Sequence, residues 1–167
     1  MGTLEKIIQK LELQPHPEGG FFKETYRSKG VISKSSLPEV FQGERNHSTC
    51  IYYLLKSDDF SAFHKINQDE IWHFYLGDAI ELHMISEEGI LNTVNVGRDV
   101  LNNEALQVVV PKNCWFAAKV MNPNSFGLVG CTVSPGFDFK DFTLASYDML
   151  ASKFPQHRDI IKAFTRQ

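Results

Sequence analysis

The chain lacks an excess of basic residues, since 17 Lys and Arg stand against 20 Asp and Glu for a net charge of −3 at pH 7. Such a charge offers no cationic surface to phosphate backbones, and we expect no nucleic-acid partner. The sequence also lacks an apolar run approaching the ~20 residues that cross a bilayer. Residues 1–6 carry neither the apolar core of a signal peptide nor a myristoylation signal. We therefore expect no membrane partner and a cytoplasmic location.

Cysteine is scarce as well. Cys50, Cys114 and Cys131 are odd in number and far apart, which disfavours a disulfide framework or a zinc knuckle and favours reduced, buried thiols. The sequence contains no repeat, low-complexity tract or linker. A length of 167 residues then predicts a single domain spanning 1–167.

Aromatic residues, in contrast, are abundant, with 13 Phe in a chain that is 43% hydrophobic. Bulky aromatics favour strands. Short segments of strand character recur between turn residues, at 21–27, 48–55, 60–66, 70–75, 80–85, 91–96, 105–110, 115–120 and 126–133. Many short strands without long intervening helices predict an antiparallel barrel. Helical spacing appears only near the ends, at 4–11, 144–150 and 158–164.

The stretch 60–77 carries the strongest indication of a binding site. Its two strand-like halves place an imidazole, a carboxylate and aromatic rings at even-numbered positions, on one face: His64, Ile66, Glu70, Trp72 and Phe74. This combination is typical of a small-molecule pocket inside a barrel. A carboxyl group buried among aromatic rings has a raised pKa, whereas a neighbouring imidazolium lowers it, so the net direction stays open.

Other residues can complete such a pocket. On the strand 21–27, Glu24 and Tyr26 share a face. Tyr26 is therefore a candidate pocket phenol, and Glu24 is a candidate to bind the hydroxyl groups of a ligand. The alternative for Glu24 is a salt bridge to Arg27 or Lys23 at the rim. Two further polar candidates for contact with a ligand are Gln107 and Asp138. Two further aromatic candidates, which either wall the cavity or fill it, are Trp115 and Phe116.

Residues 28–46 are rich in Ser, Gly, Lys and Pro, and we expect a long loop there, either a lid over the pocket or a surface loop without a role. The outward positions Ile71, His73 and Tyr75 are unusually apolar for a solvent face. Such a face predicts a partner subunit, and thus a homodimer.

Several blocks of the sequence resemble a known family. His64-x-Ile66 followed by Glu70 and Gly77 is similar to the first cupin motif, and 111–116 lies where the second belongs. The blocks 16–28, 61–66, 69–75, 109–118 and 128–139 resemble the cupin-5 family, a domain of unknown function in the RmlC-like cupin superfamily. The resemblance implies a mainly β, double-stranded β-helix (a cupin or jelly-roll barrel), with a homodimer as the usual assembly.

The cupin motifs also bear on metal binding. Metal cupins take two His and a Glu from the first motif and a third His from the second, a set of N and O ligands that suits iron, manganese or zinc. Here His64 and Glu70 are present, whereas Ile66 and Phe116 occupy the other two ligand positions. We therefore expect no metal and no other cofactor.

Three functions follow as hypotheses. The first is a metal-free epimerase or isomerase acting on a sugar-like compound, in which the resemblance implies His64 as the base, with Glu70 beside it and Tyr26 as the acid. The second is a non-catalytic protein that binds or senses a small molecule in the same cavity. The third is a metal-dependent dioxygenase or isomerase that uses His64, Glu70 and a ligand from outside the motifs.

Overall fold

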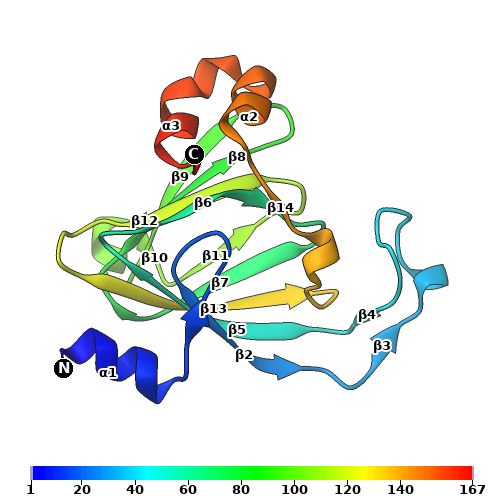
Figure 1. Cartoon of the computed structure of the whole chain (residues 1–167), viewed down its shortest axis with the longest axis horizontal. Coiled ribbons are helices and arrows are strands. Elements are labelled where there is room, and N and C mark those ends of the chain that lie inside the picture. Colours follow the sequence, from blue (N-terminus) through cyan, green and yellow to red (C-terminus); the bar gives the residue numbers. More distant parts are fainter. Residues whose placement is uncertain (1, 167) are drawn as a thin grey trace.

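Two six-stranded sheets facing each other form the body of the protein, in a computed structural model that describes residues 2–166 (Figure 1). The first sheet has the order β1 (Gln14–Pro15), β2 (Phe21–Arg27), β5 (Thr49–Lys56), β13 (Phe126–Ser134), β7 (Asp69–Gly77) and β11 (Gln107–Val110). The second has the order β10 (Glu104–Ala105), β9 (Leu91–Val96), β8 (Ile80–Ile85), β12 (Trp115–Val120), β6 (Phe60–Lys65) and β14 (Thr143–Leu144). All pairings in both sheets are antiparallel except β10 with β9.

Alternation along the strands directs one face of each sheet into a shared core. In β11, for example, Val108 and Val110 are buried, whereas Gln107 and Val109 are exposed. The core between the sheets is built from large side chains such as Tyr53, Trp72 and Phe116, each about 1% exposed. The prediction of a mainly β, jelly-roll fold is thus confirmed. It was possible because buried and exposed residues alternate along any half-buried strand.

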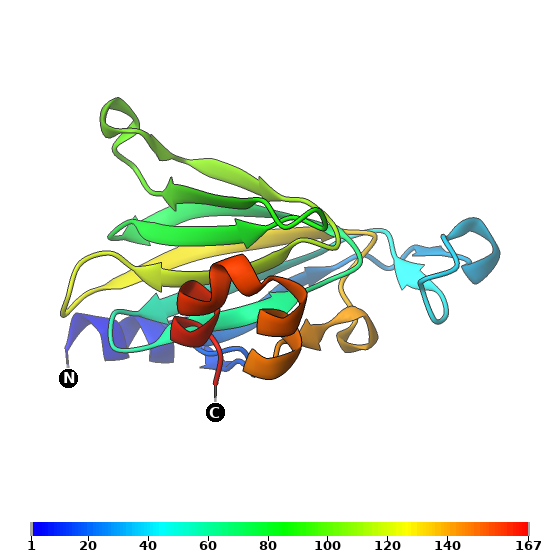
Figure 2. The same cartoon turned by 90° about the horizontal axis from the view of Figure 1, so that it is seen from above.

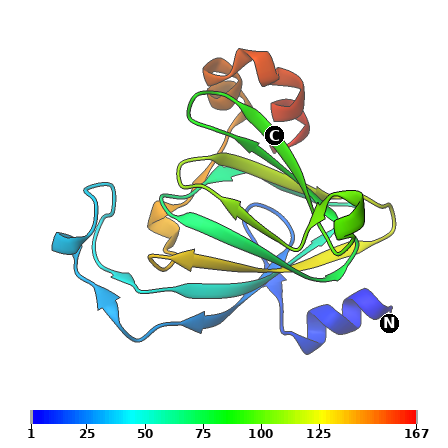
Figure 3. The ribbon, with the colours of Figure 1, turned by 180° about the vertical axis from the view of Figure 1, so that it is seen from behind.

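Short helices pack on the outside of both sheets. Helix α1 (Thr3–Lys10) packs on one end of the first sheet, over Leu54 and Leu128. Helices α2 (Tyr147–Lys153) and α3 (Arg158–Ala163) lie over the outer face of the second sheet (Figure 3). The predicted N- and C-terminal helices are therefore present, and no helix within residues 2–166 is long and apolar enough to span a membrane.

Three register shifts interrupt the regular alternation, and one of them is in β6, where Phe116 lies opposite His64 but Ala118 lies opposite Ser61. In β2, Glu24 lies opposite Ile51 and Tyr26 opposite Cys50, so that Thr25 is an extra residue. In β7, Tyr75 is likewise extra against β13. Because side chains alternate with a period of two, each extra residue exchanges the two faces for the rest of its strand.

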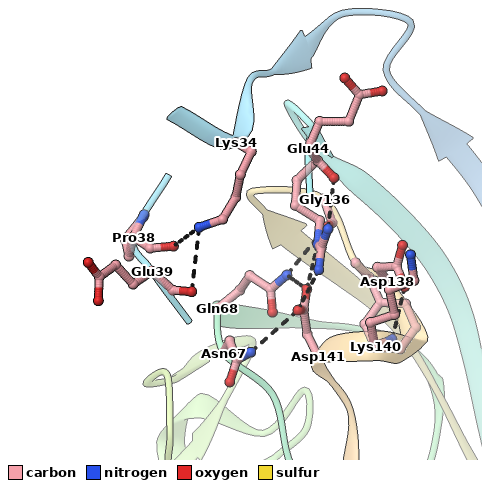
Figure 4. Close-up of polar contacts among 12 residues, drawn as sticks. Lys34, Pro38, Glu39, Glu44, Asn67, Gln68, Gly136, Asp138, Lys140 and Asp141 are labelled. Atoms are coloured by element: carbon pink, nitrogen blue, oxygen red, sulfur yellow. Dashed lines mark hydrogen bonds and ion pairs between the residues drawn. The ribbon is translucent and has the colours of Figure 1, made fainter. Parts of the chain in front are cut away.

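Residues 28–46 form an arm that extends beyond the end of the barrel (Figure 2). It contains a short hairpin of β3 (Val31–Ile32) with β4 (Arg45–Asn46) and the 3-10 turn η1 (Lys34–Ser36). At its base, buried Arg45 donates two hydrogen bonds of 2.7 Å to Asp141. Figure 4 shows that Gln68 and Asn67 also donate to Asp141. The arm is thus fixed to the barrel, and none of its residues lines the cavity described below.

Candidate functional site

A cavity of about 300 Å³ lies between the two sheets. This volume is at the lower end of the ~300–1,000 Å³ typical of small-molecule sites. His64, Ile66, Glu70 and Trp72 all line it, so the predicted face of the 60–77 hairpin does point into the barrel. The walls combine aromatic and aliphatic side chains with eight charged or polar ones: His16, Glu18, Glu24, Arg27, Thr49, His64, Glu70 and Asp138.

A buried ion pair of His64 with Glu18 lines the cavity. His64 is 2% exposed, its Nδ1 donates to the carbonyl oxygen of Ala62 at 2.7 Å, and its Nε2 lies 2.9 Å from Glu18 Oε2. Burial disfavours the imidazolium, but attraction to Glu18 outweighs it and raises the pKa of His64. Burial likewise opposes ionisation of Glu18, but the charge on His64 lowers its pKa to about 2. Both groups are therefore charged at neutral pH.

The turn 16–20 delivers Glu18 to this position. Gly19 has a φ of +116°, and a Cβ there would lie 2.1 Å from the carbonyl oxygen of Phe60, so only glycine fits. The Tyr53 hydroxyl donates to the Gly19 carbonyl at 2.9 Å, and Arg166 donates to the carbonyl of Glu18 at 3.2 Å. Neither Glu18 nor His16, which belongs to the same turn, was among the predicted site residues. Strand alternation gives no direction for side chains on a turn.

His16, from the same turn, also lines the cavity. Its Nδ1 accepts a hydrogen bond from the backbone N–H of Glu18 at 3.3 Å. Burial lowers its pKa, more than attraction to Glu18 restores it. His16 is therefore a neutral imidazole whose proton is on Nε2.

Glu70, on β7, faces the same cavity from the opposite sheet. Its Oε1 accepts a hydrogen bond of 2.8 Å from Trp72 Nε1, and its side chain is 9% exposed. Burial and repulsion from Glu18 raise its pKa to about 7, with attraction to His64 acting in the opposite direction. Glu70 thus changes its protonation state near neutral pH.

The open end of the cavity is marked by partly exposed charged residues. Arg27 donates to both carboxylate oxygens of Glu24, at 2.9 and 2.8 Å, and to the carbonyl of Phe137 at 3.0 Å. Glu24 therefore lines the cavity and also forms the salt bridge considered as its alternative. Asp138 lines the cavity beside this pair and accepts the backbone N–H of Lys140 at 2.9 Å.

Two predicted pocket residues lie on the outside of the barrel. Tyr26 is 56% exposed and does not line the cavity, because the bulge at Thr25 turns it outward and turns Arg27 inward. Gln107 is also on the outer face, where its amide lies 3.2 Å from His73 Nδ1. The bulge explains why the prediction for Tyr26 was wrong. The prediction for Gln107 was wrong because its side chain is on the exposed face of β11.

Three aromatic predictions are in the core without lining the cavity. Phe116 packs on His64, with ring centroids 3.9 Å apart, and Phe74 packs against the core between the sheets. Trp115 points to the opposite side of its strand and is buried under the C-terminal helices. Phe116 thus holds the imidazole in place, whereas Trp115 and Phe74 fill space elsewhere.

The residues of this site do not fit a metal centre. Within residues 2–166 no group of three or more His, Cys, Asp or Glu side chains is arranged to hold a metal ion. Both nitrogens of His64 are already occupied, and Ile66 lines the cavity where a second ligand would be needed. The two cations of the site, His64 and Arg27, are paired with Glu18 and Glu24 instead.

Comparisons with known proteins agree with this architecture. A family model described as Cupin superfamily (DUF985), Cupin_5, matches residues 5–145. An uncharacterized protein of Saccharomyces cerevisiae is 36% identical over 152 residues, which cover 84% of this chain and 74% of that protein. The crystal structure of a protein from Shewanella oneidensis is 38% identical, with a TM-score of 0.89 and 99% of each chain covered.

A more distant match shows the fold alone. Oxalate decarboxylase from Bacillus subtilis is 12% identical, with a TM-score of 0.55 over 90% of this chain and 36% of that one.

Proposed function

The chain belongs to the Cupin_5 family of the cupin superfamily, and we propose that it acts as a single domain whose barrel binds a small organic molecule and moves a proton on it by acid–base catalysis. The observation that supports this proposal is Glu70, a buried carboxyl group that faces the cavity and has a pKa of about 7. A group that titrates near the working pH is suited to accept and return a proton.

The roles of the two groups differ from those expected from the sequence. His64 carries its proton at neutral pH because Glu18 holds the charged form, which makes it a poor base. We assign the base to Glu70, and attraction to the neighbouring imidazolium of His64 favours the ionised, proton-accepting form of this carboxyl group. Tyr26 has no part in this scheme, since its side chain is outside the barrel.

Hydrogen exchange tests the proposal. A panel of small aldoses, ketoses and amino sugars is incubated with the protein in deuterated water, and exchange at carbon is followed by NMR. We expect exchange of at least one compound, and a loss of about 100-fold or more in Glu70→Gln, since general bases contribute 10²–10⁴-fold. Tyr26→Phe serves as the matched control and is expected to retain the wild-type rate.

A non-catalytic binding protein is the second candidate. It is favoured by the occupied state of His64, whose two nitrogens both have protein partners. Tight binding of a panel compound without any exchange at carbon would support this candidate over the first.

We also propose that the protein is a homodimer. The outer face of the first sheet carries Ile71, Val109 and Tyr75, whereas α1 covers the other end of this sheet, in a cluster that includes Tyr52. Val109 and Tyr75 are about half exposed, at 51% and 50%. A second copy of the chain would bury this apolar face.

A further inference from the structure

The charges around the cavity are unequally paired. His64 is matched with Glu18, and Arg27 is matched with Glu24. Two further carboxylates line the same cavity, Glu70 in its interior and Asp138 near its open end. Among residues 2–166, no cationic nitrogen lies within the 4.0 Å of an ion pair from either of these two.

Glu70 is also the less solvated of the two. Its side chain is 9% exposed, and the hydrogen bond that the structure gives it comes from the neutral indole of Trp72. The neighbouring thiol of Cys131 is neutral too, because burial raises its pKa well above the ordinary value. An ionised Glu70 therefore has neutral donors around it but no counter-ion of its own.

Aromatic rings line the cavity that these two carboxylates share. Phe22, Phe137, Phe139 and Phe142 line the cavity together with Trp72. Neighbouring rings lie close together, with centroids 5.0 Å apart for Phe137 and Phe139 and 5.9 Å for Phe139 and Phe142. Aromatic faces attract cations through their quadrupole, most strongly where water is excluded.

From this arrangement we propose that the cavity selects a small organic cation, a protonated amine on a compact apolar or hydroxylated body, and rejects carboxylates and phosphates. The ammonium group pairs with Glu70, the body stacks against the aromatic walls, and Asp138 attracts the cation at the entrance. The inference rests on the proposed function in using the same cavity, but it requires binding only and no transfer of a proton.

Anions are disfavoured for a specific reason. The two cations of the site, His64 and Arg27, are already neutralised, Arg27 by a two-point hydrogen bond. An incoming carboxylate would have to break one of these pairs or remain beside Glu70 and Glu18. Like charges in a cavity of low polarity repel strongly, and a buried charge without a partner is costly.

Three probes of similar size separate these possibilities: benzylamine, benzyl alcohol and benzoate. Their dissociation constants are measured by NMR titration of the intact protein at about pH 8, where Glu70 is ionised. We expect benzylamine to bind about tenfold or more tightly than benzyl alcohol, and benzoate to bind most weakly. At about pH 5, where Glu70 is protonated, the advantage of the amine should shrink.

Variants identify the counter-ion. Glu70→Gln should remove the preference for the amine, whereas Asp138→Asn should weaken binding of the amine by a smaller factor. Glu87→Gln, which changes an exposed carboxylate on a distant turn, should leave all three constants unchanged.

The proposal is overturned if benzoate binds as tightly as benzylamine, if Glu70→Gln keeps the preference, or if benzylamine fails to bind at about 10 mM. Hydrogen exchange is a separate readout. A preference for the amine without exchange at carbon refutes only the acid–base function, and exchange without the preference refutes only the charge selection.

Discussion

Glu70→Gln should make the protein more stable at alkaline pH. The folded protein keeps this carboxyl group protonated up to about pH 7, whereas its ordinary pKa is 4.5. Between these values the folded state binds more protons than the unfolded state, so the free energy of unfolding falls as the pH rises. A shift of roughly 2.5 units at ~1.4 kcal/mol per unit gives a cost of about 3 kcal/mol above pH 7. Glutamine does not ionise, and its Oε1 can still accept the Trp72 hydrogen bond.

Urea unfolding of wild type and Glu70→Gln at about pH 5 and pH 8 measures this cost. Most of the ionisation cost is absent at the lower pH and present at the higher one, so the advantage of the variant should grow by about 2–3 kcal/mol between them. Glu87→Gln, with its exposed side chain, is the control and should follow the wild type at both values. An advantage of Glu70→Gln that stays constant with pH would show that the carboxyl group ionises normally in the folded protein, and would refute the reasoning.

Two further predictions concern the periphery of the barrel. Val109→Lys, on the uncovered face of the first sheet, should convert the proposed dimer to a monomer in light scattering, whereas Val100→Lys, equally exposed elsewhere, should not; a wild-type monomer would contradict the dimer. Asp141→Asn should destabilise the fold by about 3–5 kcal/mol because it leaves the buried Arg45 without its counter-ion. Urea unfolding measures the loss, and a loss below about 1 kcal/mol would show that Arg45 finds another partner or water.

Much of the fold and part of the site follow from periodicity alone. The strands were predictable because each half-buried strand alternates, and the hairpin 60–77 placed His64, Glu70 and Trp72 correctly on its inner face. Regular strands permit this inference since side-chain direction depends only on counting residues. The same counting fails wherever a strand contains an extra residue, as Tyr26 shows.

The partner of His64 could not be predicted in this way. Glu18 belongs to a turn, and its direction depends on contacts of Gly19 with segments distant in sequence. The charge state of His64 depends in turn on Glu18. The assignment of His64 as a base was therefore reasonable from the motif, but it omitted a carboxylate that only the folded chain brings within 2.9 Å.

The bulge at Thr25 makes the chemistry of the entrance sensitive to chain length. The one extra residue in β2 brings the guanidinium of Arg27 to the rim of the cavity and turns the phenol of Tyr26 to the outer surface. Insertion or deletion of one residue at this point therefore changes which side chains lie at the entrance of the cavity, while the barrel stays intact. Evolution can in this way change what such a protein admits without touching a residue in its interior.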